Sequence, residues 1–352
     1  MSDVLILGGT RNLGHFTALE LLKAGHRVTV MNRGVTPDEL PPEVERLRGD
    51  RGDPDGIRRA IHGREFDLVL DTTTYDGAEA RSAIELFGGR AGRYVFISSG
   101  QVYLVRERIA RPFREEDYDG PVMAEPPRES DDYESWAYGI GKRKAEDEFS
   151  AAFDRNAFPV TTLRLPMVAS ERDHHGRIQA YVARLLDGRA ILVPEEPGLP
   201  LRHVYVDDVA RLVVQLAGTR DGIGRVYNIS YGESMSLADF LSMLARLAGR
   251  KLEIQRIPRG ELQSAALLPH CSPFSGRWMS ELDNTRSLAE LGEIVVRYTR
   301  PETYLPVLIA DYEKRWRPNG SVPLGYEQRP KELEFVTASI ARGGVANRSQ
   351  TG

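Results

Sequence analysis

The chain has 352 residues, enough for about two domains, and its 47 basic and 51 acidic residues give a formal net charge of −4. This balance argues against a strongly basic nucleic-acid-binding protein, and the single cysteine excludes an intrachain disulfide and a cysteine-based metal cluster. No apolar run approaches the ~18–20 residues that span a membrane, and no secretory signal is visible, so we expect a cytoplasmic protein without a metal site.

Short apolar runs alternate with helical patterns through the first half of the chain. Strands are expected at residues 4–7, 27–31, 66–71, 94–98 and 160–165, and helices near residues 14–24, 55–62, 78–87 and 138–153. This alternation predicts right-handed crossovers and an α/β fold whose doubly wound parallel sheet is covered by helices on both faces.

The pattern loosens after residue 166, where proline, glycine and irregular sequence become more frequent. A strand and helix at residues 202–216 are expected to return to the sheet. We therefore expect the sheet domain to comprise residues 1–166 and 202–229, and a second domain to comprise residues 167–201 and 230–330. Residues 331–352 read as a mobile C-terminal tail.

A glycine-rich turn directly follows the first predicted strand and opens the first helix. It consists of Gly8, Gly9, Thr10, Arg11, Asn12, Leu13 and Gly14. In such a turn a glycine permits the tight bend, main-chain N–H groups face the ligand, and the helix N-terminus attracts a pyrophosphate. The position of the turn between strand and helix predicts a dinucleotide-binding site rather than an ordinary loop.

The residues at the end of the second predicted strand help to distinguish an NAD site from an NADP(H) site. An NAD site usually places Asp or Glu here, but this chain has Asn32 and Arg33. Arg11 and Arg33 together could clamp a 2′-phosphate, so we favour NADP(H) as the cofactor, with NAD as the alternative; Arg33 could also simply face solvent. Asp50, followed by Arg51, could reach the adenine amino group or belong to a solvated turn.

A tyrosine and a lysine four residues apart share one face of the predicted helix at 138–153. The ammonium of Lys142 would favour the phenolate form of Tyr138 and lower a pKa that is ordinarily ~10. Lysine is informative here because it accounts for only six of the 47 basic residues. A hydroxyl at the carboxyl end of a parallel strand could hold the substrate oxygen, and we choose Ser99 over Ser98 for this role.

Taken together, these motifs resemble the extended short-chain dehydrogenase/reductases, the NAD(P)-dependent epimerase/dehydratase group, over roughly residues 3–300. Further motifs carry the resemblance: Gly49-Asp50, Val102-Tyr103, Leu163–Pro166, His203–Ala210, Tyr227–Ile229 and Asp283…Leu291-Gly292. The resemblance implies a Rossmann domain with a smaller C-terminal substrate-binding domain, a Ser99–Tyr138–Lys142 catalytic triad, nucleotide-sugar substrates and a homodimer. Additional cofactor contacts are expected at Arg51, Thr72, Thr73, Ser98 and Pro166.

The chain also departs from the family pattern. Arg11 replaces a usual glycine, as in an atypical branch with poorly characterised reductases and plastid RNA-binding relatives. Gly100 and Gln101 stand where the 4,6-dehydratases of the family have Asp and Glu, and an amide cannot exchange a proton in that role. Elimination and decarboxylation are therefore disfavoured, and hydride transfer remains.

Candidate substrate-binding residues are Thr74, Gln101, His174, Arg177 and Arg202. The two histidines at 174 and 175 could equally be exposed loop residues, and the arginines could be surface ion pairs. The function expected is an NAD(P)-dependent oxidoreductase that transfers hydride at a carbonyl or alcohol of a small, polar, sugar-like substrate. Alternatives are a nucleotide-sugar 4-epimerase with tightly held NAD, a natural-product ketoreductase, and a non-catalytic RNA-binding or regulatory protein.

Overall fold

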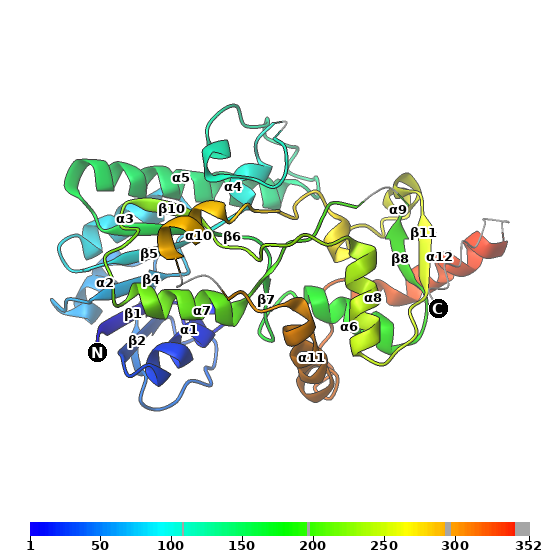
Figure 1. The fold of residues 1–352 in the computed structure, drawn as a ribbon, viewed down its shortest axis with the longest axis horizontal. Helices are drawn as coiled ribbons and strands as arrows, with labels where there is room; N and C mark the ends of the chain where they lie inside the picture. Colours follow the sequence, from blue (N-terminus) through cyan, green and yellow to red (C-terminus); the bar gives the residue numbers. More distant parts are fainter. Residues whose placement is uncertain (108, 196–197, 293–296, 342–352) are drawn as a thin grey trace. The chain divides into compact units, whose positions relative to one another are not determined.

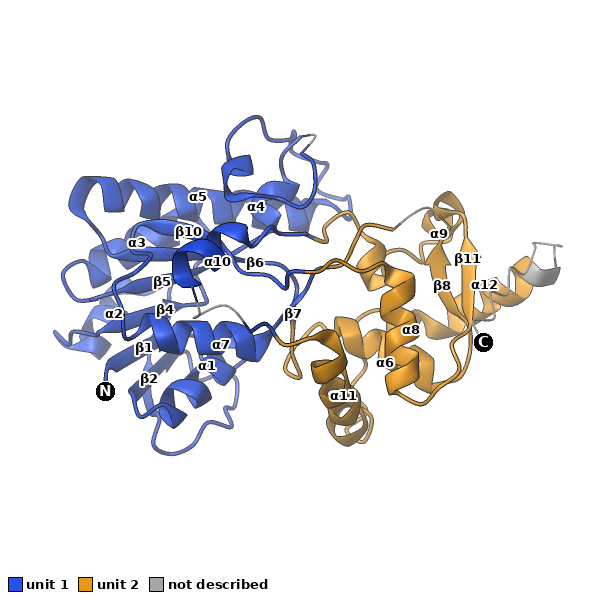
Figure 2. Cartoon of the chain, in the orientation of Figure 1, with its two compact units in different colours: residues 1–168, 202–232, 280–298 blue, residues 169–201, 233–279, 299–352 orange. Residues whose placement is uncertain are grey.

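The computed structural model describes residues 1–107, 109–195, 198–292 and 297–341, and the chain divides into two compact units (Figures 1 and 2). Unit 1 comprises residues 1–168, 202–232 and 280–298; unit 2 comprises residues 169–201, 233–279 and 299–352. The segment at 280–298, which we expected in the second domain, lies in unit 1. The isolated β-bridge between Phe113 and Leu282 helps to hold it there.

Unit 1 is built on a seven-stranded sheet in the order β10-β6-β5-β4-β1-β2-β3, with every pair parallel. Its strands are β1 (Asp3–Leu7), β2 (Arg27–Asn32), β3 (Glu45–Arg48), β4 (Leu68–Asp71), β5 (Tyr94–Ser99), β6 (Val160–Leu165) and β10 (Arg225–Asn228). The predicted doubly wound, Rossmann-type sheet is confirmed. The short strand β9 (Val204–Tyr205), expected to return to this sheet, lies outside it.

Helices cover both faces of the sheet (Figure 1). One face carries α1 (Asn12–Lys23) and α7 (Val206–Leu216), and the other carries α2 (Pro54–Ile61), α3 (Gly77–Phe87) and α5 (Tyr133–Asn156). Strands buried on both sides must be apolar on both sides, which is why residues 4–7 form an uninterrupted apolar run. The second face packs aromatic rings together, with Phe96 and Phe149 at 4.9 Å between ring centroids.

The loops at the carboxyl ends of the strands carry short elements of their own. These are α4 (Gln101–Leu104) and η1 (Glu115–Tyr118), with α10 (Thr285–Leu291) also in this unit. Because all strands of a parallel sheet end at the same edge, the loops after β1, β2, β4 and β5 gather at that edge, where open α/β sheets bind ligands.

Unit 2 is smaller and mainly helical. It contains β7 (Val168–Ala169) in part, α6 (Arg177–Leu186), β8 (Ile191–Pro194), α8 (Leu237–Leu247), β11 (Ile254–Ile257), α9 (Arg259–Ser264), η2 (Pro273–Ser275), α11 (Pro301–Asp311), η4 (Tyr312–Trp316), η5 (Tyr326–Gln328) and α12 (Arg329–Ala341). The strands β8 and β11 pair in parallel. Cys271 is fully buried in the core of this unit, and burial raises its pKa to about 12. No helix in the described ranges is long and apolar enough to cross a membrane.

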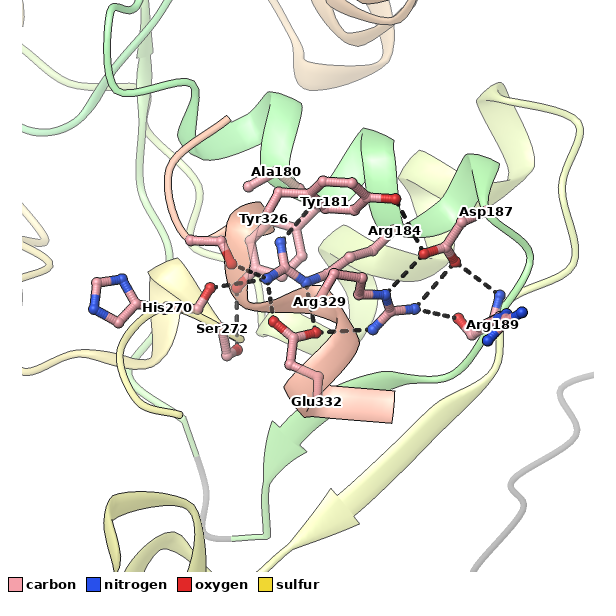
Figure 3. A network of polar contacts seen from close by, with 11 residues as sticks. Ala180, Tyr181, Arg184, Asp187, Arg189, His270, Ser272, Tyr326, Arg329 and Glu332 are labelled. Atoms are coloured by element: carbon pink, nitrogen blue, oxygen red, sulfur yellow. Dashed lines mark hydrogen bonds and ion pairs between the residues drawn. The ribbon is translucent and has the colours of Figure 1, made fainter. Parts of the chain in front are cut away.

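The expected C-terminal tail begins inside an ordered helix, so that prediction is wrong for residues 331–341 (Figure 3). Glu332 of α12 is fully buried and accepts a 3.1 Å hydrogen bond from Nε of the equally buried Arg184. Arg329 donates to Glu332 at 2.9 Å and to Asp187 at 2.8 Å. This network fixes α12 to α6. Residues 342–352 of the expected tail lie outside the described residues.

Candidate active site

The glycine-rich turn after β1 adopts a backbone that requires glycine. Gly8 has φ +112°, and a Cβ there would lie 2.4 Å from Oγ1 of Thr72. Gly9 has φ +88°, and a Cβ on Gly14 would lie 2.7 Å from the Gly9 nitrogen. The three glycines therefore let the turn lie against the loop after β4 and let α1 start directly beside the turn.

The N-terminus of α1 is suited to an anion. Its N-cap residue, Arg11, makes no side-chain capping hydrogen bond, and the first turn carries no acidic residue. Oδ1 of Asn12 is buried and has no hydrogen-bond partner among the described residues. First-turn N–H groups without a side-chain cap, together with the helix dipole, match the pyrophosphate of a dinucleotide. The residues present therefore fit the predicted cofactor site.

Arginines gather around the end of β2. Oδ1 of Asn32 accepts hydrogen bonds from the Gly34 nitrogen at 2.9 Å and from Nη1 of Arg48 at 2.6 Å. Arg33 is exposed, and Arg11 donates to Oγ1 of Thr36 at 3.0 Å. Arg48 was not predicted as a site residue, although its place at the end of the neighbouring strand β3 was a usable signal.

Asp50 and Arg51 lie in different environments. Asp50 is exposed, and its Oδ1 accepts from the Gly52 nitrogen at 3.0 Å, which is the solvated turn considered as its alternative role. Arg51 instead pairs with Asp71 at 2.5 Å and donates to Oγ1 of Thr73 at 3.0 Å. Its guanidinium is thus held by protein groups, which differs from the cofactor contact expected of it.

Asp71, at the end of β4, organises the following loop and was missed by the sequence analysis. Its fully buried carboxylate accepts hydrogen bonds from the nitrogens of Thr73 at 2.8 Å and Thr74 at 3.0 Å, and from the hydroxyl of Tyr94. Burial by itself would raise the pKa of Asp71, but the charge of Arg51 and these hydrogen bonds outweigh it and lower the pKa to about 2.

The hydroxyls of the three threonines after β4 all make hydrogen bonds within the protein. Oγ1 of Thr72 donates to the Leu7 carbonyl at 2.9 Å, and Oγ1 of Thr73 bonds both Asp71 and Arg51. Thr74 is fully buried, and its hydroxyl donates to Asp71 at 2.5 Å. The expected substrate contact through the Thr74 side chain is therefore incompatible with its burial.

Tyr138 and Lys142 lie four residues apart on α5, as predicted. Lys142 is 2% exposed, and its Nζ donates to the carbonyls of Thr74 at 2.6 Å and Ile97 at 2.8 Å. The same Nζ lies 5.8 Å from the centroid of the half-buried Tyr138 ring. Burial lowers the pKa of Lys142 from its ordinary 10.5 to about 8.

Two glycines between these residues allow α5 to approach both neighbouring loops. A Cβ on Gly139 would lie 2.8 Å from the Gln101 carbonyl, and one on Gly141 would lie 2.4 Å from the Tyr75 carbonyl. Tyr138 is therefore brought beside the loop after β5, and Lys142 beside the loop after β4. The two glycines of the motif Tyr-Gly-Ile-Gly-Lys are therefore needed for this close packing, because larger residues would clash with the loops.

The two serines at the end of β5 differ in environment. Ser98 is buried, and its hydroxyl donates to the buried Glu146, so the expected cofactor contact through Ser98 is not open to its side chain. Ser99 is half-buried, and its Oγ accepts from the Gln101 nitrogen at 3.2 Å. Oε1 of Gln101 is buried without a hydrogen-bond partner in the described part of the chain. Pro166 is buried at the end of β6.

A buried polar network lies behind Ser98. Arg164 donates to Glu146 at 3.0 Å and to the Tyr103 hydroxyl at 2.6 Å, and that hydroxyl donates to Oδ1 of Asn228 at 2.8 Å. These residues come from β6, α5, α4 and β10. The network therefore fixes four elements around the end of β5, and its polar groups find their hydrogen-bond partners within the protein.

The remaining substrate candidates fall in both units. His174 and His175 are exposed in unit 2, with ring centroids 3.9 Å apart. Arg177 of the same unit donates to Asp173 at 3.1 Å. Arg202 belongs to unit 1, where its Nη1 donates to the Leu282 carbonyl at 2.9 Å.

Comparison with known proteins places this geometry in a family. The family model described as the NAD dependent epimerase/dehydratase family matches residues 4–230, well over half of the chain. The chain belongs to this family. The predicted resemblance is thereby confirmed, and the fold of this epimerase/dehydratase-family protein is that of an NAD-dependent enzyme.

Its relatives have diverse names. The chloroplast stem-loop binding protein of 41 kDa b from Arabidopsis thaliana is 26% identical over 70% of this chain and 63% of its own length, so the chain spans less than two thirds of that relative. The 2'-dehydrokanamycin reductase of Streptomyces kanamyceticus is 24% identical over 80% of this chain and 76% of its own length. The UDP-glucose 4-epimerase of Thermotoga maritima, solved with UDP-glucose, superposes with a TM-score of 0.68 at 18% identity, covering 88% of this chain and 98% of the epimerase.

Proposed function

We propose that this protein is an NAD(P)-dependent oxidoreductase that transfers hydride at a carbonyl or alcohol of a sugar-like substrate, nucleotide-sugars included. One observation carries the proposal: the buried ammonium of Lys142 lies 5.8 Å from the ring of Tyr138, on a helix packed against the loop that follows Ser99. A lysine so placed is difficult to explain by packing alone, because burying an ammonium is costly.

Each of the three residues has a distinct role in this proposal. The dinucleotide, when bound, supplies or accepts the hydride. Tyr138 moves the proton of the reacting hydroxyl, and the charge of Lys142 favours the phenolate that this step requires. Ser99 holds the substrate oxygen through its hydroxyl. Gln101 stands beside them as an amide that cannot exchange a proton, which supports hydride transfer without elimination.

For the dinucleotide, we favour NADP(H) over NAD. Arg11, Arg33 and Arg48 are the cations around the end of β2, and Asn32 stands where a carboxylate would bind a ribose 2′-hydroxyl. A ligand that binds only the folded state must raise the melting temperature. We expect NADP+ to raise it more than NAD+ at equal concentration, and Arg33→Ala to reduce the NADP+ shift alone. A larger shift with NAD+ would reverse this preference.

The substrate is best sought among polyhydroxylated ketones and nucleotide-sugars. The reductase relative supports the first class, and the epimerase structure supports the second. A 4-epimerase would release tightly held dinucleotide on denaturation and turn over without added cofactor. A reductase would consume added NAD(P)H stoichiometrically. Absorbance of the reduced nicotinamide during a substrate panel therefore distinguishes these reactions.

A second candidate function is RNA binding, because one relative is named a stem-loop binding protein. The net charge of −4 opposes it, since non-specific RNA affinity comes from cationic surfaces. Stem-loop RNA binding at physiological salt, unaltered by Tyr138→Phe and accompanied by no dinucleotide binding, would favour this candidate over the enzyme. The homodimer and the cytoplasmic location stay predictions, and light scattering of the purified protein tests the first.

A further inference from the structure

We propose that the buried pair Asp71 and Arg51 positions Lys142 and sets its charge, with Asp71 favouring the charged form and Arg51 opposing it, so that two residues outside the triad govern its proton. The inference rests on the proposed function only for the catalytic use of Lys142. Neither residue is expected to touch the substrate, because Asp71 is fully buried and Arg51 is held by Asp71 and Thr73. Both are positioning residues.

A continuous path of contacts links the pair to the lysine. Asp71 accepts from the nitrogens of Thr73 and Thr74, which fixes the course of the loop after β4. The carbonyl of Thr74 then accepts from Nζ of Lys142 at 2.6 Å. Arg51 reaches the same loop through Oγ1 of Thr73 at 3.0 Å. The loop that carries the pair is thus also a hydrogen-bonding partner of the ammonium.

The charges that influence Lys142 come from every side. Asp71 of β4 and Glu146 of its own helix act to raise its pKa, as does Glu79 of α3 more weakly, whereas Arg51 acts to lower it. The rings of Tyr75, Phe96 and Tyr138 also lie within 5.8 Å of Nζ. Arg164, paired with Glu146 at 3.0 Å, balances that carboxylate. Both carboxylates are thus paired with an arginine, and Asp71 acts on the pKa of Lys142 more strongly than Glu146 does.

The pair has a functional consequence because burial opposes the charged form of Lys142. A neutral amine would no longer stabilise the phenolate of Tyr138. Asp71 offsets the burial of Lys142, and Arg51 offsets Asp71 in turn. Removing the charge of Asp71 should therefore lower the pKa of Lys142, and removing the charge of Arg51 should raise it. A purely structural role for the pair would not produce shifts of opposite sign.

The six lysines of the chain make this measurable in the full-length protein. Lys142 is buried, and the other five are exposed: Lys23, Lys144, Lys251, Lys314 and Lys331. A pH titration of the protein labelled with carbon-13 at lysine Cε should therefore resolve one resonance with a midpoint far below the rest. The loss of this resonance in Lys142→Met assigns it to Lys142.

The variants then give opposite expectations. Asp71→Asn should move the Lys142 midpoint down by about 1 pH unit, the scale of one lost neighbouring charge, and Arg51→Gln should move it up. Tyr94→Phe, which keeps both charges and removes one hydroxyl from Asp71, should leave it within about 0.3 units on the same scale. If Asp71→Asn does not fold, the upward shift in Arg51→Gln still decides the question.

Shifts of the same sign in both charge variants, or no shift in either, would overturn the proposal. The lysine resonance needs no substrate, so its outcome is separate from that of the proposed function. If the opposite shifts appear but no substrate is ever reduced or oxidised, the hydride-transfer proposal fails alone. If activity is found while the Lys142 midpoint is unmoved, the positioning role fails alone.

Discussion

Nζ of Lys142 donates a 2.6 Å hydrogen bond to the main-chain carbonyl of Thr74, which connects α5 to the loop after β4. The contact ties the predicted catalytic lysine to a loop whose course is set by the buried carboxylate of Asp71. A lysine so enclosed has a measurable effect on stability as well as on chemistry.

The burial of Lys142 should make the stability of the folded protein depend on pH. The pKa of Lys142 is about 8 in the folded protein and returns to about 10.5 on unfolding. Between these values the unfolded state binds more protons, so this residue makes stability rise with pH. From pH 7 to 10 the rise should amount to about 2–3 kcal/mol.

Urea unfolding of the native protein and of Lys142→Met at both pH values measures this rise. The variant lacks the titrating group, so the difference in unfolding free energy between the two proteins should change in favour of the native chain as pH increases. Other titrating groups cancel in the comparison. A pH-independent difference would show that the pKa of Lys142 is the same in the folded and the unfolded protein, which contradicts a pKa lowered by burial.

The close packing of α5 supplies a second prediction. Gly141→Ala would place a Cβ 2.4 Å from the Tyr75 carbonyl, which forces the helix or the loop to shift and should cost about 1–3 kcal/mol of stability. The matched control is Gly260→Ala in α9, where nothing lies within 4 Å of the added Cβ. The control should be neutral or more stable by up to about 1 kcal/mol. Equal effects in thermal unfolding would contradict the packing argument.

The anchoring of α12 supplies a third prediction. Glu332→Gln would leave the buried Arg184 without its anionic partner, at a cost of about 3–5 kcal/mol. Glu334→Gln makes the same chemical change on an exposed residue of the same helix and should alter stability by less than about 0.5 kcal/mol. Denaturant unfolding compares the two. A similar small effect in both would mean that α12 behaves as the mobile tail expected from the sequence.

Features governed by local sequence could be predicted. The turn at Gly8–Gly14, the parallel strands and the Tyr138–Lys142 spacing each depend on residues that are neighbours along the chain or on one helix face. The order of these signals then sufficed to indicate the family. The glycines on either side of Ile140 are visible in the sequence, but their role in packing could not be predicted. That role depends on loops that are distant along the chain.

Features governed by distant contacts could not be predicted. Nothing near Asp71 in the sequence reveals that its partners are Arg51 and Tyr94. The threonines after β4 were therefore predicted to contact a ligand, whereas their hydroxyls stabilise the loop. The burial of Glu332 depends on Arg184, which lies 148 residues earlier. An acidic residue in a polar segment is ordinarily exposed, and only the folded chain shows the exception.

The fourth prediction tests the reaction itself. The phenol of Tyr138 is the proposed proton-transfer group, so Tyr138→Phe should lower the rate of hydride transfer about 100-fold or more while leaving the melting-temperature shift with NADP+ intact. Tyr75→Phe is the control, because its ring lies 6.2 Å from that of Tyr138 and belongs to no proposed catalytic step. The control should keep the native rate.

The most direct measurement follows deuterium from NADPH labelled at the nicotinamide C4 into the products of a panel of polyhydroxylated ketones and nucleotide-sugar ketones, by mass spectrometry. We expect label on the former carbonyl carbon of at least one product, at a rate that falls about 100-fold or more in Tyr138→Phe. Equal label transfer by the native protein and by Tyr138→Phe, or no transfer to any member of the panel, would contradict it.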